Sequence, residues 1–447
     1  MVYNPRPRFG FQTAPCAAPP FFPEGPMKQS PRRACGIDFG TSNSTLGVVE
    51  GTPRLVPLEG ASTDLPTAVF YGIEHDTRFL IGRAAVAAYV EGHGGRLMRS
   101  LKSVLGTALI EETTQVHRRR IAFRDIVAAF VREVKARAEH QLGAPLGRVV
   151  MGRPVHFVDD DAEADARAEA TLAEVAHHVG FKEVSFQYEP VAAALAYEQQ
   201  VARETLALIA DLGGGTADFT LVRLGPARRE AADRASDLLA NDGVRIGGTD
   251  YDQRLAMASV MPALGFGSRM ARGDIDVPGG PYWDLATWSQ VNRLYDPKAI
   301  SQIRSTRRDA AQPELVDRLL HVIEMRRGHG ILMAVEGAKI ALSGDERAAI
   351  DLSWLEAGLT AEATREGFEE STARLTQRLA DTVRRCLQAA GVQPDDVDAL
   401  FFTGGTSAIP AVRATIRALV PQAEVVDGDR FGAVGTGLAV EAQRRYG

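Results

Sequence analysis

Cysteine and long apolar runs are the scarcest features of this sequence. Its three cysteines, Cys16, Cys35 and Cys386, are odd in number and far apart, which argues against a disulfide-stapled scaffold, and no Cys/His spacing suggests a zinc site. No apolar run approaches the roughly 18 residues that a membrane-spanning helix needs. The net charge of −6 gives no support for a nucleic-acid or anionic-membrane surface. These absences predict a soluble, cytoplasmic protein with no nucleic-acid or membrane partner.

The first 33 residues differ from the rest of the chain in their proline content. They hold eight of the 23 prolines, and prolines interrupt every apolar patch, so the stretch lacks the continuous apolar core of a signal peptide. We therefore expect residues 1–33 to be a disordered leader. Met27 is an alternative start, because "MKQSPRRACGIDFG" would open the folded part directly.

From residue 34 onward, strand and helix patterns alternate, which indicates an α/β protein. The chain of 447 residues is long enough for two or three domains. Glycines, aspartate caps and Pro410 mark the expected helix ends. The expected helices cover residues 124–142, 159–180, 369–390 and 408–421, and the expected strands cover residues 148–155, 183–188 and 398–405.

A weak internal repeat carries the functional argument. "GIDFGTSNSTLGVV" (36–49) and "ADLGGGTADFTLVRL" (210–224) both run from an apolar strand through an aspartate and a glycine-containing turn into a second apolar strand. The two aspartates are Asp38 and Asp211. A unit duplicated at this distance suggests two similar lobes, each contributing one hairpin to a shared cleft.

Turns of this composition suit phosphate groups. Small residues expose successive backbone N–H groups and let a ligand approach without a Cβ in the way. Asp38 and Asp211 could fix Mg²⁺ through its waters, because Mg²⁺ dehydrates reluctantly. Thr41, Ser42 and Thr216 add hydroxyls for phosphate oxygens. An ordinary glycine-rich β-turn explains either hairpin alone, but it does not explain two matched hairpins with matched aspartates.

The same motifs resemble a known superfamily. Three segments are similar to motifs of the actin, hexokinase and heat-shock ATPases. The two phosphate motifs resemble "GIDFGTSNS" and "ADLGGGTADFTL", and the adenosine motif resembles "FFTGGTSAIPAVR". Four further motifs narrow the resemblance to the nucleotide-binding domain of the seventy-kilodalton heat-shock chaperones of the DnaK type. They are "SLKSVLG", "YEPVAAALAYE", "RIGGTDYDQRLA" and "VEGAKIALS". Within that group, the chain looks most like the short YegD-like members.

The resemblance implies a two-lobed, actin-like (ribonuclease H-like) α/β fold with duplicated lobes around a nucleotide cleft. Residues 34–205 would form the first lobe, to which residues 428–447 return. Residues 206–427 would form the second lobe, with an enlarged insertion at about 253–335. The implied cofactors are ATP or ADP and Mg²⁺.

Site roles also follow from the resemblance. Asp38 and Asp211 would position the hydrated Mg²⁺, Lys102 would neutralise charge on the γ-phosphate, and Glu189 would orient the attacking water. Asp218 and Thr216 would assist beside the metal and the phosphates. The implied nucleotide-binding residues are Gly40, Thr41, Ser42 and Asn43 in the first turn, Gly213, Gly214, Gly215 and Thr216 in the second, Gly247 and Gly248, Glu336 and Lys339 at the ribose, and Ser343, Gly404 and Gly405 beside the adenine.

Ordinary structural roles remain open for single residues. Lys102 alone would be a solvated surface lysine, and Glu189, which precedes a proline, would cap the helix that begins there. Asp218 would lie on an exposed strand face. Glu336 and Lys339, three residues apart on a helix, would form a surface ion pair.

Three departures from the family pattern stand out. Ile340 and Ala408 occupy positions where typical members carry arginines that sandwich the adenine, which predicts weaker affinity or looser base selection. The sequence ends soon after "GAVGTGLAVEA", where a linker and a peptide-binding domain would follow, so we expect a member without that domain. The long stretch between "GGTDYD" and "VEGAK" carries Trp283, Trp288 and Tyr295, which would either anchor a partner or bury the insertion's own core.

The sequence therefore predicts a Mg-dependent, slow ATPase of the heat-shock type that acts on an unidentified protein partner as a chaperone or remodelling factor. Two alternatives stay open. A filament-forming actin relative would polymerise with ATP. A small-molecule kinase would need a carboxylate base facing an acceptor hydroxyl, and the sequence offers no clear candidate.

Overall fold

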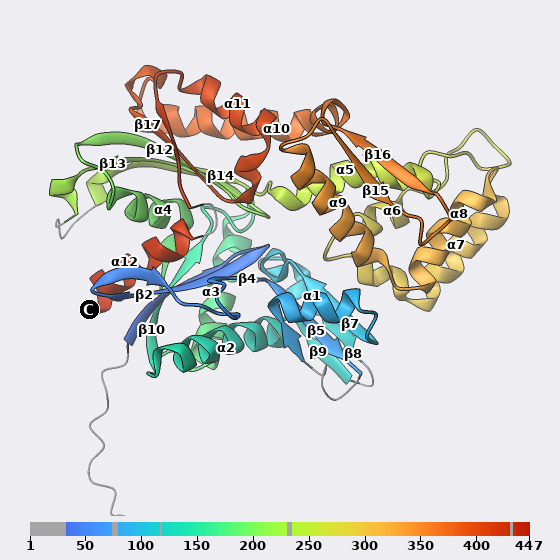
Figure 1. Cartoon of the computed structure of the whole chain (residues 1–447), viewed down its shortest axis with the longest axis horizontal. Helices are drawn as coiled ribbons and strands as arrows, with labels where there is room; N and C mark the ends of the chain where they lie inside the picture. Colours follow the sequence, from blue (N-terminus) through green and yellow to red (C-terminus); the bar gives the residue numbers. More distant parts are fainter. Residues whose placement is uncertain (1–32, 74–78, 117–118, 230–234, 430–431) are drawn as a thin grey trace, which may run out of the picture.

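The computed structural model describes residues 33–73, 79–116, 119–229, 235–429 and 432–447 (Figure 1). The predicted leader, apart from Arg33, and the alternative start at Met27 lie outside the described residues. Within the described ranges, every helix is too short or too polar to cross a bilayer.

The first sheet is built around the first of the two predicted hairpins. It consists of β1 (Arg33–Phe39), β2 (Asn43–Glu50), β3 (Thr52–Leu55), β4 (Asp64–Pro66), β10 (Leu146–Arg153) and β11 (Glu183–Tyr188). Its strand order is β11-β10-β1-β2-β3, with β4 also paired to β2. β1 and β2 are antiparallel, and Asp38 lies opposite Thr45. β10 and β11 continue the sheet in parallel on the other side of β1.

The second sheet repeats this arrangement around the second hairpin. It consists of β12 (Thr205–Leu212), β13 (Ala217–Leu224), β14 (Leu238–Val244), β17 (Ala399–Thr403) and β18 (Glu424–Asp427), in the order β14-β13-β12-β17-β18. β12 and β13 are antiparallel, and Asp211 lies opposite Asp218. β17 and β18 pair in parallel beyond β12. The predicted duplication is therefore confirmed, with Asp211 in the place of Asp38 and Asp218 in the place of Thr45.

The helices beside the sheets begin and end where local chemistry requires. They are α2 (Phe123–Leu142), α3 (Ala162–His178), α10 (Arg365–Ala390) and α11 (Pro410–Leu419). α2 ends at Gly143, whose φ of 59° is left-handed, and Asp161 caps α3 by accepting a hydrogen bond from the Ala164 N–H at 2.9 Å. α10 begins four residues before the predicted start, because the Thr364 side chain caps it.

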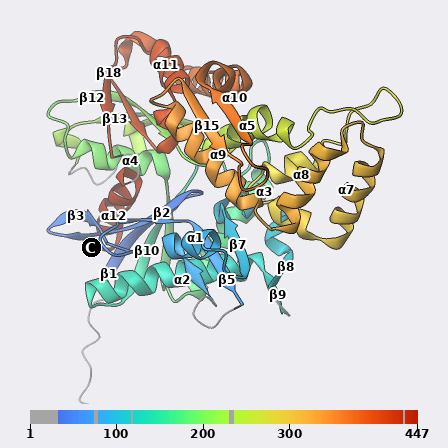
Figure 2. The same cartoon turned by 45° about the vertical axis from the view of Figure 1, so that its right-hand side comes forward.

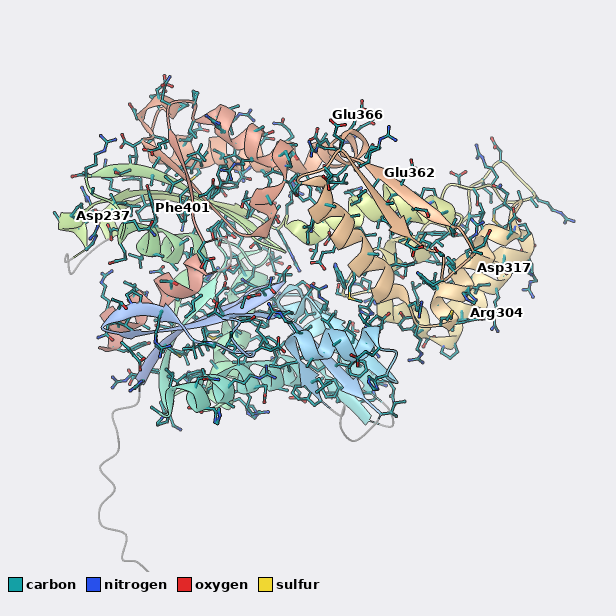
Figure 3. The ribbon with its side chains drawn as sticks, in the orientation of Figure 1. Asp237, Arg304, Asp317, Glu362, Glu366 and Phe401 are labelled. Atoms are coloured by element: carbon teal, nitrogen blue, oxygen red, sulfur yellow. The ribbon has the colours of Figure 1, made fainter. Side chains whose placement is uncertain are left out.

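Two helices cross between the sheets. α4 (Glu189–Glu198) packs against β12 and β13, whereas α12 (Ala433–Tyr446) packs against β1, β2 and β10. α4 and α12 also pack on each other, and a Cβ added to Gly437 would overlap the backbone of Ala192. In the core that these helices share with both sheets, Tyr197 stacks on Phe401 with ring centroids 4.6 Å apart; Figure 3 labels Phe401 on β17. The crossing helices connect the two lobes into one packed body.

Each lobe carries an outer part beyond its sheet. In the first lobe it comprises β5 (Ala68–Gly72), β6 (Leu80–Ile81), α1 (Gly82–Val90), β7 (Gly95–Arg99), β8 (Thr113–Val116) and β9 (Arg119–Ala122). In the second lobe it comprises α5 (Gly248–Ala263), α6 (Gly280–Leu285), α7 (Pro297–Asp309), α8 (Pro313–Glu324), α9 (Gly328–Leu342), β15 (Arg347–Asp351) and β16 (Thr360–Thr364). Figures 1 and 2 both place α7 and α8 at the outer end of the molecule.

The aromatic residues of the insertion are mainly core residues. Trp288 is 4% exposed and belongs to the core of the second lobe, and Trp283 and Tyr295 pack against the same core. The interpretation of Trp288 as a partner anchor is therefore wrong, because its indole is covered by the core of the second lobe and by Arg99 of the first.

Candidate functional site

The two hairpin turns lie face to face between the lobes. The β1–β2 turn carries Thr41 and Ser42, and the β12–β13 turn carries Gly214 and Gly215. A Cβ added to Gly214 would overlap the Ser42 hydroxyl, and one added to Gly215 would lie 3.2 Å from the Thr41 Cβ. Glycine is needed at both positions because the opposite turn occupies the space of a side chain.

Four backbone donors of these turns are not used by the protein. Across the described ranges, no group accepts a hydrogen bond from the backbone N–H of Thr41, Ser42, Gly214 or Gly215. Buried or half-buried N–H groups normally find an acceptor in the protein, in water or in a ligand. Four such donors on two facing turns form a cradle for a multivalent anion.

The backbone carbonyl groups of each turn, in contrast, accept hydrogen bonds from the protein. The Thr67 hydroxyl donates to the Gly40 carbonyl at 2.7 Å. In the second turn, the Thr406 hydroxyl donates to the Gly213 carbonyl at 2.7 Å, and the Thr249 N–H donates to the Gly214 carbonyl at 2.8 Å. The turns are therefore held rigidly while their N–H groups stay available.

Lys102 and Glu189 form a buried ion pair beside the turns. Lys102 lies in a short 3₁₀ helix (Leu101–Val104), Glu189 begins α4, and the ammonium donates to Glu189 Oε1. Each residue is 6% exposed, so the interpretation of Lys102 as a surface lysine is wrong. Burial alone would lower the pKa of Lys102, but the charges of Glu189 and Asp38 outweigh it and raise the pKa above its ordinary value. Lys102 therefore stays cationic.

Three aspartates near this ion pair are held at unusually high pKa values. Burial, followed by repulsion from Glu189, raises the pKa of Asp38 and of Asp218 to about 7. The same two causes raise the pKa of Asp211 well above its ordinary value. Asp218 is 1% exposed, so its interpretation as part of a solvated strand face is wrong. Four carboxyl groups facing one lysine leave a local deficit of positive charge.

A cavity of about 400 Å³ joins these groups. Asp218, Gly247 and Ser343 are the predicted site residues that do not line it. Asp218 lies opposite Asp211 on the adjacent strand. Gly247 packs so closely behind the second turn that an added Cβ would overlap Gly214 and Gly215. Ser343 is the residue at which α9 ends. The predicted residues that line the cavity are Asp38, Gly40, Thr41, Ser42, Asn43, Lys102, Glu189, Asp211, Gly213, Gly214, Gly215, Thr216, Gly248, Glu336, Lys339, Gly404 and Gly405.

Part of the cavity lining is apolar. Ile340 and Ala408 belong to it together with Val434, and Ile340 is 65% exposed. Thr406 and Val434 are lining residues that the sequence analysis missed. Thr406 stands inside a quoted motif, "FFTGGTSAIPAVR", whereas Val434 enters from α12, and nothing in its local sequence indicates a place in the cleft.

Glu336 and Lys339 do not pair with each other; each forms an ion pair with a residue of another element. Arg99 of β7 donates to Glu336 at 2.8 Å, which joins the outer parts of the two lobes across the cleft. Lys339 pairs with Asp252 of α5 at 2.7 Å and donates to the Gly248 carbonyl at 3.2 Å. The alternative of a surface ion pair within α9 is therefore wrong.

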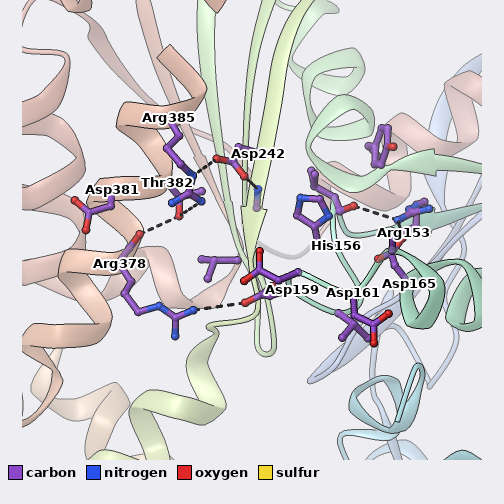
Figure 4. A pocket seen from close by; sticks show the side chains of 17 residues that line it. Arg153, His156, Asp159, Asp161, Asp165, Asp242, Arg378, Asp381, Thr382 and Arg385 are labelled. Carbon is purple, nitrogen blue, oxygen red and sulfur yellow. Dashed lines mark hydrogen bonds and ion pairs between the residues drawn. The ribbon is translucent and has the colours of Figure 1, made fainter. Parts of the chain in front are cut away.

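A larger cavity, of about 800 Å³, lies between the loop after β10, strand β14 and helix α10 (Figure 4). No predicted site residue lines it. Its arginines are largely neutralised by neighbouring acids: Arg385 pairs with Asp242 at 2.8 Å, and Arg378 lies 3.5 Å from Asp159. The unused donors and uncompensated carboxylates are found in the smaller cavity, which is therefore the candidate functional site.

The carboxylates of the site fit a hydrated divalent cation. In the described part of the chain, no three His, Cys, Asp or Glu side chains converge into a direct metal-binding set. Asp38 and Asp211 nevertheless lie on corresponding strands at the two turns, and the high pKa values show that positive charge is lacking there. Mg²⁺ would supply it while keeping its waters and binding phosphate oxygens.

The repeated sheets and facing turns define a two-lobed ATPase of the actin-like fold. A family model described as Hsp70 protein matches residues 111–261 and 321–446, which lie in both lobes. The chain belongs to the Hsp70 family, whose members are ATP-binding, chaperone-like ATPases. The match leaves out residues 262–320, which hold most of the insertion, and residues 1–110, which hold the first hairpin and Lys102.

Proposed function

We propose that this protein binds Mg·ATP between the two turns and hydrolyses it slowly to ADP and phosphate. The observation that carries the proposal is the cradle of four unused N–H donors on Thr41, Ser42, Gly214 and Gly215. Phosphoryl transfer to water depends on positioning and charge neutralisation more than on covalent chemistry; the turns would supply the positioning, and Lys102 with bound Mg²⁺ the neutralisation.

The residues of the site divide this work. The turns hold the phosphates, and Lys102 meets the negative charge that builds on the terminal phosphate. Glu189, fixed by Lys102, orients the attacking water. Mg²⁺, when bound, neutralises the phosphate oxygens, and Asp38 and Asp211 hold its waters. Asp218 holds its place through the Val155 N–H, which donates to it at 2.6 Å, and supports Asp211 from the adjacent strand.

The rest of the nucleotide would occupy the part of the cavity with apolar lining. Glu336 and Lys339 would contact the ribose, and Ile340 would offer an apolar face for the base; all three line the cavity. Hydrolysis would be slow because four carboxyl groups crowd the reacting phosphate and the water has a single ion pair to orient it.

We further propose that lobe closure around ATP is coupled to action on a protein partner, as a chaperone or remodelling factor. The support is membership of the Hsp70 family together with the Arg99–Glu336 contact, which links the lobes at the mouth of the site. Capture experiments with ATP and with ADP should retain different proteins. Identical sets would contradict the coupling.

Activity is tested by phosphate release with Mg·ATP, with EDTA as the metal-free control. Asp211→Asn should reduce turnover by about 100-fold, the size expected for losing a charge-positioning group. Asp381→Asn, an exposed change on α10, is the matched control. Turnover that is insensitive to both EDTA and Asp211→Asn would exclude this site.

A further inference from the structure

A third cavity, of about 480 Å³, lies behind the Lys102 helix. We call it the rear cavity; Ser100, Ser103, Gly215, Arg245, Ser289 and Arg293 are among its lining residues. Gly215 lines both this cavity and the nucleotide cavity. Ser100 and Ser103 stand on either side of Lys102, so the tip of the second turn and the Lys102 helix separate the two spaces.

The rear cavity contains two guanidinium groups. Arg245 donates to the Ser103 carbonyl at 2.6 Å, which fixes it against the Lys102 helix. Arg293 belongs to the insertion and is exposed; in the described part of the chain it forms no salt bridge, although its charge acts on Asp284. Of the acids in the lining, Asp250 is engaged by the Gly247 N–H at 2.8 Å, and Glu112 is exposed. Guanidinium groups and hydroxyls together are the donors that recognise phosphate oxygens.

Much of the lining of this cavity lies outside the ranges that the Hsp70 family model matches. Ser100, Ser103, Ser289 and Arg293 all lie in ranges that the Hsp70 family model leaves unmatched. The cavity therefore lies where the insertion meets the Lys102 helix.

The placement of the rear cavity points to one ligand. The identity of this ligand depends on the proposed hydrolysis. The phosphate cleaved from ATP would arise beside Lys102 and Gly215 while ADP still fills the nucleotide cavity. The Arg99–Glu336 contact also joins the two lobes across the cleft. We propose that the rear cavity binds inorganic phosphate, and that the phosphate cleaved from ATP leaves through it, drawn by Arg245 and Arg293.

Phosphate binding is tested first without nucleotide, so that the result does not depend on hydrolysis. Inorganic phosphate is titrated into the full chain at constant ionic strength and followed by calorimetry. Arg293→Gln should weaken binding by about 10-fold, the effect of losing one charge-assisted contact. Arg272→Gln, an exposed arginine of the same insertion that does not line the cavity, should leave it unchanged. Ser289→Trp, which fills the cavity, should abolish it. No binding by the wild type, or equal binding by all variants, would overturn the proposal.

A single-turnover experiment then identifies the source of the phosphate. Cleavage is followed by acid quench and release by a phosphate sensor. In Ser289→Trp, cleavage should keep its rate while release slows by about 10-fold or more. Phosphate binding with unchanged release would mean that the cavity takes phosphate from solution and is not an exit. Absence of cleavage in the wild type would contradict the proposed ATPase, while the titration would still decide whether the cavity binds phosphate.

Discussion

The ammonium group of Lys102 and the carboxylate of Glu189 form an ion pair that joins a short helix of the outer first lobe to the start of a crossing helix. Removing one partner of a buried pair leaves the other charge uncompensated. The pair is therefore the most sensitive point of the proposed mechanism, because it places a cation and a water-orienting oxygen at the same phosphate.

Replacement of Lys102 should separate binding from turnover. Lys102→Ala is expected to leave the affinity for Mg·ATP within a few-fold while lowering kcat by about 100-fold or more, because the lysine meets charge that develops only in the transition state. Calorimetry and phosphate release measure the two effects. Lys135→Ala, a change in α2 away from the cavity, is the control. Equal losses of affinity and rate would limit Lys102 to ground-state binding.

The Arg99–Glu336 contact should restrain nucleotide release. Arg99→Met removes the 2.8 Å bond across the cleft and leaves the predicted ribose contact of Glu336 in place. We expect the dissociation rate of a fluorescent ADP analogue, measured by stopped flow, to rise about 3-fold or more. Arg83→Met, which breaks surface ion pairs within the first lobe, should have no effect. An unchanged rate in Arg99→Met would mean that the cleft does not open at this contact.

Base selection should depend on Ile340. This side chain is 65% exposed inside the cavity, so a bound base would cover it. Ile340→Arg should tighten ATP binding by about 3- to 10-fold, because a guanidinium stacked on the base contributes roughly 0.5–2 kcal/mol. Competition titrations of ATP against GTP should show a larger preference for ATP in the variant. Weaker ATP binding in Ile340→Arg would place the base elsewhere.

The buried aspartates should make the nucleotide-free protein less stable as the pH rises towards 8. Asp38 and Asp218 have pKa values of about 7 in the folded state and ionise near 4 when unfolded. Between these values the folded state holds more protons, so the free energy of unfolding falls with rising pH and levels off above about 7. His329, whose pKa burial lowers to about 3, acts in the opposite direction below about pH 6.5.

A variant separates these contributions. Asp218→Asn should raise the thermal midpoint at pH 8 by about 2 °C or more and reduce the difference between pH 6.5 and pH 8. Differential scanning fluorimetry of the variant and of Asp381→Asn as an exposed control gives the comparison. A lower midpoint for Asp218→Asn at pH 8 would mean that the ionised carboxylate stabilises the fold.

Much of the fold could be predicted because the signals are local. Alternating apolar patterns, the Asp161 cap and Gly143 mark elements that need no distant contact to be recognised. The duplicated hairpins also predicted the two facing turns that we propose for the phosphates, since backbone chemistry at glycine and threonine depends little on the rest of the chain.

Contacts between distant elements were harder to predict. Val434 reaches the cavity only because α12 returns to the first sheet, and the Arg99 partner of Glu336 comes from the other lobe. The burial of Trp288 depends on how the insertion folds back on the second lobe and on Arg99 of the first lobe, whose guanidinium lies 4.3 Å from its ring centroid. No periodicity in the sequence encodes such pairings.

Calorimetric titration with Mg·ATP tests most directly whether the two facing turns form the nucleotide site. The wild-type protein should bind one Mg·ATP per chain. Gly214→Val should abolish binding, because its side chain would collide with Ser42 and separate the turns, whereas Gly280→Ala, where an added Cβ meets open space, should bind as the wild type does. No binding by the wild type, or undiminished binding by a folded Gly214→Val protein, would contradict the account.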